Sequence, residues 1–206
     1  MASSIRWTPP GVIILTLWIA GLVPAFRSFW LGADNELGPD PVRSFEHLLG
    51  LWAFRFLLAS LAITPLRLVT GYSLIRYRRT LGLLAFVYAL MHVATYIALD
   101  LQFDFAILWR DLTRRPFLVF GMIAFLCLIP LAATSSQFLI RKLGRNWRRL
   151  HRIVYVALVA ASAHFLMAFK TWHPEALLYV LSGSILLIIR VGYKIRSQVR
   201  QTGAKM

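Results

Sequence analysis

The sequence has few acidic residues and only one cysteine. Asp and Glu account for 8 of its 206 residues, against 23 Lys and Arg, and the single thiol is Cys127. One thiol excludes an intrachain disulfide, an iron–sulfur cluster and a thiolate zinc site. The dinucleotide-binding fingerprint G-x-G-x-x-G is missing as well. Cys127 lies in an apolar run, which is typical of a small packing residue.

The composition is that of an integral membrane protein. Hydrophobic residues make up 59% of the chain, charged residues 15%, and the mean hydropathy is +0.66. A net charge of +15 would indicate nucleic-acid binding in a soluble protein, but here Lys and Arg cluster between apolar runs that carry almost no charge. This pattern is typical of loops that face anionic lipid. We therefore expect membrane lipid, and no nucleic acid, as a partner.

Six apolar runs are long enough to cross a bilayer, which predicts a single all-α domain over residues 1–206, a bundle of six transmembrane helices. The first run lacks a clear cleavage site, so we interpret it as a membrane helix and not as a signal peptide. Arg55 and a corner at Pro65–Arg67 are expected to interrupt the second run; Arg55 should face protein, snorkel or pair with an acid. No internal repeat is apparent. The predicted spans are 10–31, 45–69, 80–99, 116–134, 150–169 and 175–193.

Basic residues in two connections set the expected orientation. They lie between the second and third spans and between the fourth and fifth, whereas most acidic residues fall in the other connections. Since loops rich in Lys and Arg stay in the cytoplasm, both termini are predicted to be cytoplasmic. The basic residues are Arg67, Arg76, Arg78 and Arg79 in the first connection, and Arg141, Lys142, Arg145, Arg148 and Arg149 in the second.

Two histidines lie inside predicted spans at matching depth. His92 is 13 residues beyond Arg79, and His164 is 15 residues beyond Arg149. At about 1.5 Å per residue, both lie roughly 20 Å from the inner surface of a core about 30 Å thick. Two imidazoles at one depth on different helices can bind opposite faces of one metal. A pair of buried structural histidines is the alternative.

Small residues surround both histidines, where a flat macrocycle needs room. No carboxylate or thiolate occurs at their depth, which favours haem over zinc. With His92 and His164 in both axial positions the iron would have no open site, which suits electron transfer. Close helix approach also explains the small residues. They are Ala85, Ala89 and Thr95 in the third span and Ala157, Ala160, Ala161 and Ala168 in the fifth.

Two further histidines are candidates for cofactor contacts. His151 lies 13 residues before His164, near the inner surface and about 140° away around a straight helix, so the two cannot share a porphyrin. A second haem would need a ligand on the third span near Arg78 and Arg79. His151 is a candidate to hold a propionate, a flavin or a quinone, or to ligate a haem weakly; an interfacial histidine among arginines is the alternative. His47 is a candidate contact for the outer edge of a haem or a quinone, again with an interfacial position as the alternative.

Long stretches of the sequence resemble a known family. They are DPVRSFEHLLG at 40–50, LIRYRRTLGLLAFVYALMHVATY at 74–96, RRPFLVFG at 114–121, and TSSQFLIRKLGRNWRRLHRIVY at 134–155 followed by HF at 164–165. These strings span nearly the whole chain and resemble the MsrQ (YedZ) family, the haem-binding membrane subunits of bacterial periplasmic methionine sulfoxide reductase systems. That family belongs with the ferric reductase-like transmembrane domains, which are six-helix bundles that carry b-type haem.

The resemblance implies a b-type haem held by His92 and His164 in the bacterial inner membrane, with His151 as a further haem-associated histidine. Electrons would arrive from the quinone pool or a cytoplasmic flavin reductase, with FMN and quinone as candidate cofactors. They would leave to a periplasmic molybdopterin enzyme that repairs methionine sulfoxide. The chain itself would be an electron-transfer subunit and not the site of methionine sulfoxide reduction.

Two departures from the wider superfamily qualify this implication. NADPH oxidases and ferric reductases carry an appended flavin and nicotinamide domain, whereas 13 residues follow Tyr193 here, so the chain is expected to borrow its electron donor. Two-haem members of the superfamily have two histidines on the third helix. With His92 alone there, a second bis-histidine haem is not expected.

Two other function classes remain as alternatives. A transporter needs intramembrane acids or a helix broken near the midplane, and the predicted spans contain essentially no carboxylate. A cofactor-free membrane anchor or assembly factor needs neither histidine. Four arginines are candidate contacts for propionates, flavin phosphate or a quinone headgroup, although membrane topology alone also explains their charge. They are Arg78, Arg79, Arg148 and Arg149.

Overall fold

The computed structural model describes residues 10–169 and 173–203, with side chains described as far as Tyr193. Six of its helices are long and apolar enough to cross a membrane. They confirm the six predicted spans, with ends that differ by a few residues. These spans are Gly11–Ala33, Pro41–Thr70, Ile75–Asp100, Pro116–Ala133, Arg145–Met167 and Pro174–Tyr193.

The secondary structure of the described residues is helical. Short 3₁₀ segments, Ile75–Tyr77 and His151–Ile153, precede the third and fifth spanning α-helices, and a π-helical turn, Tyr96–Asp100, ends the third span. The α-helices are α1 (Pro10–Ala33), α2 (Pro41–Thr70), α3 (Arg78–Thr95), α4 (Phe105–Arg114), α5 (Pro116–Ala133), α6 (Gln137–Leu143), α7 (Arg145–Leu150), α8 (Val154–Met167) and α9 (Pro174–Gly203).

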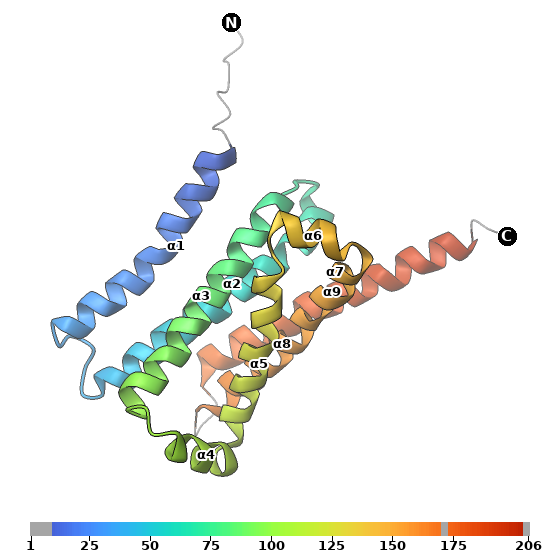
Figure 1. The fold of residues 1–206 in the computed structure, drawn as a ribbon. Helices are drawn as coiled ribbons and strands as arrows, with labels where there is room; N and C mark the ends of the chain where they lie inside the picture. The colour runs from blue at the N-terminus through green and yellow to red at the C-terminus, as the bar shows by residue number, and fades with distance from the viewer. Residues whose placement is uncertain (1–9, 170–172, 204–206) are drawn as a thin grey trace, which may run out of the picture.

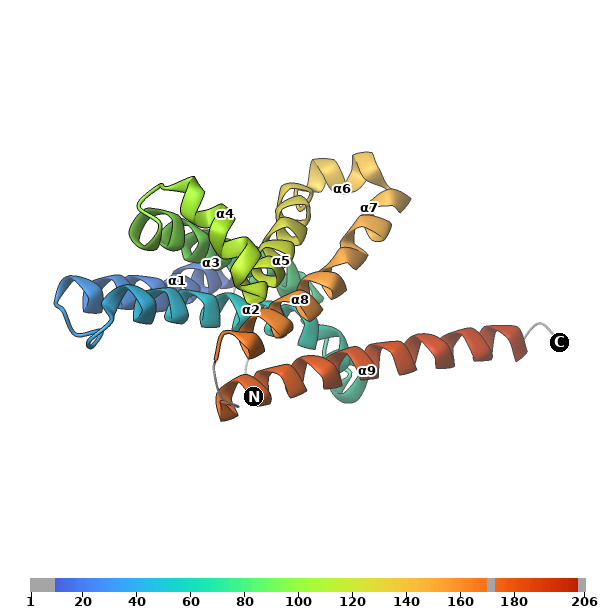
Figure 2. The same cartoon turned by 90° about the horizontal axis from the view of Figure 1, so that it is seen from below.

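Two antiparallel helix pairs, α2 with α3 and α5 with α8, form the centre of the bundle (Figure 1). Helix α9 packs against α8 and α2, while α1 lies on the outside of α2 and α3 (Figure 2). Helices α6 and α7 lie at one end of the bundle and α4 at the other. Cys127 packs against the core, as predicted. The core cluster consists of Phe54, Leu57, Leu58, Leu61, Ala85, Leu128, Leu131, Ala157 and Leu158.

The predicted interruption of the second span is wrong, because α2 runs unbroken through Arg55 and Pro65. Proline lacks the N–H that bonds the carbonyl four residues earlier. Here that carbonyl, on Leu61, accepts a hydrogen bond from the guanidinium of Arg190 on α9, 129 positions later. The same guanidinium donates to Thr64 Oγ1 at 3.1 Å. The compensating donor is so distant along the chain that no local signal predicts it.

Arg55 is accommodated by contacts that cross the bundle. Its Nε donates to the Tyr179 hydroxyl at 2.6 Å, and its Nη2 lies 3.5 Å from the Glu175 carboxylate. The guanidinium also lies over the Trp52 ring, 4.8 Å from its centre. Arg55 therefore faces protein and pairs with an acid, as two of the three expectations had it.

Tyr88 connects α1 to the centre of the bundle. Its side chain is completely buried, and its hydroxyl accepts from the Ala25 N–H at 2.9 Å and donates to the Gly21 carbonyl at 2.7 Å. In an uninterrupted helix these two main-chain groups would bond each other. The hydroxyl is thus inserted into the ladder of α1 beside Pro24, a known cause of helix kinks.

Three helices lie where the sequence predicts only connecting segments. They are α4, α6 and α7, with 10, 7 and 6 residues. Such lengths are too short for hydrophobic periodicity to distinguish helix from loop. The starts of α4 and α6 carry recognisable caps: Asp104 accepts from the Ala106 N–H at 2.8 Å, and Ser136 accepts from the Leu139 N–H at 3.2 Å.

Replacing Arg190 by Met should destabilise the bundle, because the Leu61 carbonyl loses its donor. We expect a loss of about 1–3 kcal/mol, the usual effect of leaving a buried acceptor unpaired. Unfolding of the detergent-solubilised protein measures it. Pro65→Ala is the matched background, since it restores the N–H that bonds Leu61, and Arg190→Met should cost less there. An equal cost in both backgrounds would show that Arg190 acts instead through Thr64 and through the Tyr155 hydroxyl, to which its Nη1 donates at 3.1 Å.

Candidate functional site

The rings of His92 on α3 and His164 on α8 meet inside the bundle. Their centres lie 6.1 Å apart and their planes are inclined at 74°. Imidazole nitrogens bind first-row metals at about 2 Å, which places two ring centres on opposite sides of one metal at about 6 Å. The observed separation is compatible with one metal between the two rings.

A glycine on α2 makes room for the His92 ring. A Cβ at Gly50 would lie 3.2 Å from His92 Nδ1, closer than nearly all real contacts of this kind. The same nitrogen donates to the main-chain carbonyl of Glu46 at 2.8 Å. Since Glu46 precedes Gly50 by about one helical turn, the carbonyl and the open surface lie on one side of α2. Helix α2 therefore supplies both the hydrogen-bond acceptor and the space.

Helix α5 holds the His164 ring in the same way. A Cβ at Gly121 would lie 2.7 Å from His164 Nδ1 and 2.9 Å from its Cε1, so only glycine fits without a shift. That nitrogen donates to the carbonyl of Phe117, one turn before Gly121, at 2.8 Å. The Phe117 ring also packs against the imidazole, with centres 5.8 Å apart.

The two helix pairs thus repeat one arrangement, although the sequence shows no evident repeat. Each histidine follows its glycine by almost the same distance, 42 residues from Gly50 to His92 and 43 from Gly121 to His164. Both glycines are absent from the residues that the sequence singled out. Their matched spacing from the two intramembrane histidines is the signal that points to them.

The hydrogen bonds determine which ring nitrogens are free. A carbonyl oxygen only accepts, so Nδ1–H is the donor in His92 and His164, and Nε2 carries the lone pair of the neutral ring. Metal-ligating histidines are usually oriented in this way. Among the described residues, no three His, Cys, Asp or Glu side chains gather as a metal site. Two nitrogen ligands suit a metal already held by a macrocycle and fall short of the four that structural zinc requires.

His151 does not join this pair. It lies in the 3₁₀ segment before α8, where its ring stacks on Trp147 with centres 3.9 Å apart. Its Nδ1 donates to the Trp147 carbonyl at 3.2 Å. Arg78, partly buried at the start of α3, is an electrostatic neighbour of both His151 and Arg190. Arg78 thus links His151 electrostatically to Arg190, and we refer to these three residues as the basic cluster, which is separate from the His92–His164 pair.

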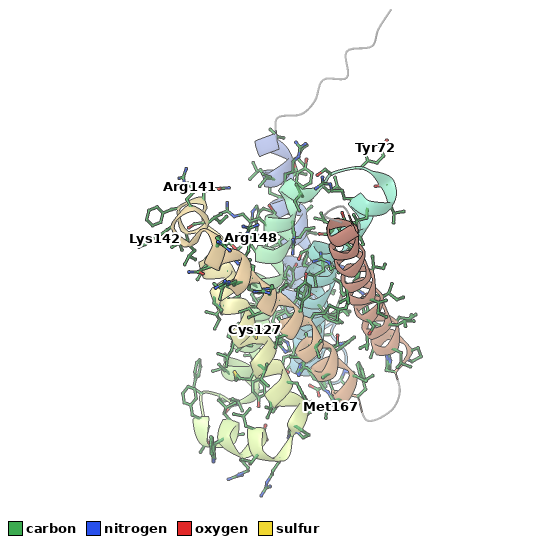
Figure 3. The ribbon with its side chains drawn as sticks, turned by 90° about the vertical axis from the view of Figure 1, so that its right-hand side faces the viewer. Tyr72, Cys127, Arg141, Lys142, Arg148 and Met167 are labelled. Atoms are coloured by element: carbon green, nitrogen blue, oxygen red, sulfur yellow. The ribbon has the colours of Figure 1, made fainter. Side chains whose placement is uncertain are left out.

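The other predicted contacts are spread over both ends of the bundle. Arg79, Arg148 and Arg149 are exposed. Figure 3 shows Arg148 on the same end as Arg141 and Lys142, with Met167 at the far end of α8. His47 lies near the start of α2 and packs against Phe165 and Phe169, with ring centres 6.0 and 5.7 Å away. It therefore belongs to an aromatic cluster between α2 and α8.

Comparison with known proteins identifies the family. Residues 49–162 match the family described as ferric reductase like transmembrane component. The chain is 51% identical, over 175 residues, to the protein-methionine-sulfoxide reductase heme-binding subunit MsrQ of Brucella ovis, and equally so to those of Brucella canis and Brucella melitensis. The match covers 85% of this chain and 80% of each relative. This chain belongs to the MsrQ family. The resemblance noted in the sequence is confirmed.

The ferric reductase-like part of this MsrQ family member includes most of the paired arrangement. The matched range contains Gly50, His92, Gly121 and His151, and it ends two residues before His164. The MsrQ relatives, which are matched over 85% of the chain, extend the likeness well beyond those limits.

Alanine at the two glycines should destabilise the protein to different degrees. Gly121→Ala forces the His164 ring to move, whereas Gly50→Ala presses less closely on His92. Overpacking of this kind costs about 1–3 kcal/mol. Gly82→Ala is the control, because its Cβ would meet nothing within 4 Å. Thermal unfolding in detergent should rank Gly121→Ala lowest and leave Gly82→Ala unharmed; equal midpoints for the three would show that both rings have room to shift.

Proposed function

We propose that this chain is a b-type haem subunit that carries electrons across the bacterial inner membrane. The observation that supports this most directly is the His92–His164 pair, two imidazoles 6.1 Å apart with each Nδ1 bonded to the main chain. The names of the MsrQ relatives describe heme-binding subunits and agree with it. His92 and His164 are the proposed axial ligands through Nε2.

Haem, when bound, supplies a one-electron carrier. His92 and His164 would hold the iron from both sides, which would leave neither face open to oxygen or substrate. The carbonyls of Glu46 and Phe117 hold each ring at the required rotation and make its Nε2 more basic. These features suit electron transfer, with reorganisation limited because each ring is held by a neighbouring helix.

The proposed orientation of the bundle in the membrane is based on the distribution of positive charge. Arg141, Lys142 and Arg148 lie at the end of the bundle formed by α6 and α7 (Figure 3). The connection between α2 and α3 lies at the same end. Because positively charged connections stay in the cytoplasm, we assign this end, and with it both termini, to the cytoplasmic side. Helix α4 then lies on the periplasmic side.

Electrons are proposed to enter at the basic cluster, from the quinone pool or from a cytoplasmic flavin reductase with FMN as a carrier. Within the described residues, the Arg190 Nε is buried without a hydrogen-bond partner, and the charge of Arg78 acts on both Arg190 and His151. Guanidinium groups bind phosphate and carboxylate well. This supports an anionic cofactor group near His151, with exposed Arg79, Arg148 and Arg149 as further contacts. His47 stays a proposed contact at the periplasmic edge.

The proposed acceptor is a periplasmic molybdopterin enzyme that reduces methionine sulfoxide and so repairs proteins. The name of the relatives, a subunit of a methionine sulfoxide reductase, implies a separate catalytic subunit. In this proposal the chain delivers electrons, and the sulfoxide is reduced on the partner.

The ligand assignment predicts two different outcomes for the three histidine variants. His92→Ala and His164→Ala should each abolish haem retention, because one imidazole is lost from the pair. His151→Ala should only reduce haem content or shift the spectrum. Haem-to-protein stoichiometry and the absorbance spectrum of the purified variants measure this, with the unaltered chain expected to show a low-spin bis-imidazole spectrum.

Two results would contradict this assignment. Complete loss of haem in His151→Ala, with haem retained in His164→Ala, would overturn the pairing of His92 with His164. An unaltered protein without a Soret band would favour a cofactor-free membrane anchor.

The entry side can be tested with two matched pairs of arginines. Neutralising Arg148 and Arg149 together with glutamine should slow haem reduction by reduced FMN several-fold and weaken its dependence on salt, because the attraction for the flavin phosphate falls. Stopped-flow absorbance in detergent, where both ends are accessible, measures the rate. The control is glutamine at Arg110 and Arg114, exposed at the opposite end. Equal slowing in both variants would contradict the assigned entry side.

A further inference from the structure

Helix α4 lies across the end of the bundle opposite α6 and α7 (Figures 1 and 2). The chain turns sharply before it, where Gln102 and Phe103 have φ of 49° and 63°, values uncommon for residues other than glycine. Asp104 then caps the helix. This turn takes α4 out of the direction of α3, and Pro116 starts the next span two residues after its end.

Contacts on one side of α4 fix its rotation about its own axis. Asp111 is only 9% exposed, accepts a hydrogen bond from the Tyr96 hydroxyl at 3.1 Å, and lies 3.4 Å from Arg115 Nε. Leu108 and Leu112 are partly buried beside it. This side therefore faces the bundle, and the remaining surface of the helix is open.

The open surface of α4 has an apolar edge and a basic edge. Phe105 and Trp109, which are 63% and 72% exposed, lie about 40° apart around the helix. Arg110 and Arg114, both exposed, lie about 100° and 140° from Trp109. An aromatic edge next to a cationic edge is typical of helices that lie in the plane of a membrane surface.

We propose that α4 lies in the headgroup boundary of the bilayer, with Phe105 and Trp109 inserted among phospholipid acyl chains and Arg110 and Arg114 directed to phosphates and water. Exposed apolar side chains follow soon after the apolar edge in the sequence, beginning at Val119 in α5, a helix long and apolar enough to span a membrane. Trp and Arg at this depth match the usual interfacial residues. The proposal depends on the six spans and not on haem.

This position holds the ends of α3 and α5 at a defined depth. Tyr96 and Arg115 connect α4 to the two spans, since both bind Asp111. Tyr96 lies near the end of the third span, and Arg115 lies directly before the fourth. The basic edge is then the part of α4 presented to the aqueous phase.

Single-cysteine variants with Cys127→Ser test the proposal. Trp109→Cys and Phe105→Cys report on the apolar edge, and Arg110→Cys is the matched control on the basic edge. Each is labelled with an NBD fluorophore in phosphatidylcholine nanodiscs, where both faces meet the aqueous phase. Labels at 109 and 105 should be quenched by brominated acyl chains, and iodide should quench them several-fold less than the label at 110.

Strong iodide quenching at 109 and 105, equal to that at 110 and without an effect of bromolipid, would overturn the proposal. It would show that the apolar edge is open to water and thus to a protein partner. Two positions on the apolar edge keep the test decisive if one variant fails to fold, which size-exclusion chromatography detects. Haem content serves as a separate readout, so failure of the haem assignment leaves this test intact.

Discussion

The bundle is organised around two contacts in which an imidazole rests on a glycine and bonds a carbonyl one turn earlier. Gly50 allows α3 to bring His92 against α2, and Gly121 allows α8 to bring His164 against α5. A Cβ at Gly121 would force the His164 ring to shift, whereas a Cβ at Gly50 would press on the His92 ring by a few tenths of an ångström. The distance between the two rings consequently depends on how the two helix pairs pack against each other through the core. A substitution in that core can therefore change the distance between His92 and His164 although the substituted residue contacts neither.

Several main-chain and charged groups inside the spans are hydrogen-bonded by residues of other helices. Tyr88 inserts into α1 beside Pro24, and Arg190 bonds the carbonyl that Pro65 frees in α2. Arg55 reaches across to α9 in turn. Without water in the hydrocarbon region, each of these groups needs a protein partner. The same hydrogen bonds attach the peripheral helices α1 and α9 to the central pairs. The bonds that pair these polar groups therefore also hold the helices together.

The length of the apolar runs was sufficient to predict the six spans, and counting residues from the basic loops was sufficient to predict that His92 and His164 lie at the same depth. Both depend on periodicity and rise per residue, which are local properties. The corner at Pro65 was predicted wrongly because its compensation comes from Arg190, a non-local donor. Helices α4, α6 and α7 were missed since they are shorter than the window over which periodicity can be read. A glycine in an apolar run has no signal of its own, so in the sequence Gly50 and Gly121 are marked only by their matched spacing from His92 and His164.

The bond between Arg190 and the Leu61 carbonyl has a consequence for biosynthesis. Chains enter the membrane from the N-terminus, so α2 is inserted while the residues of α9 are still to be made. Until α9 arrives, the Leu61 carbonyl has neither the amide that proline lacks nor the guanidinium that replaces it, an expensive state in lipid. In a nascent chain that stops before Arg190, the Leu61 carbonyl in the second span therefore has no hydrogen-bond donor, whereas in the finished chain it has one. The hydrogen bond on this one oxygen therefore distinguishes a completed bundle from an incomplete one.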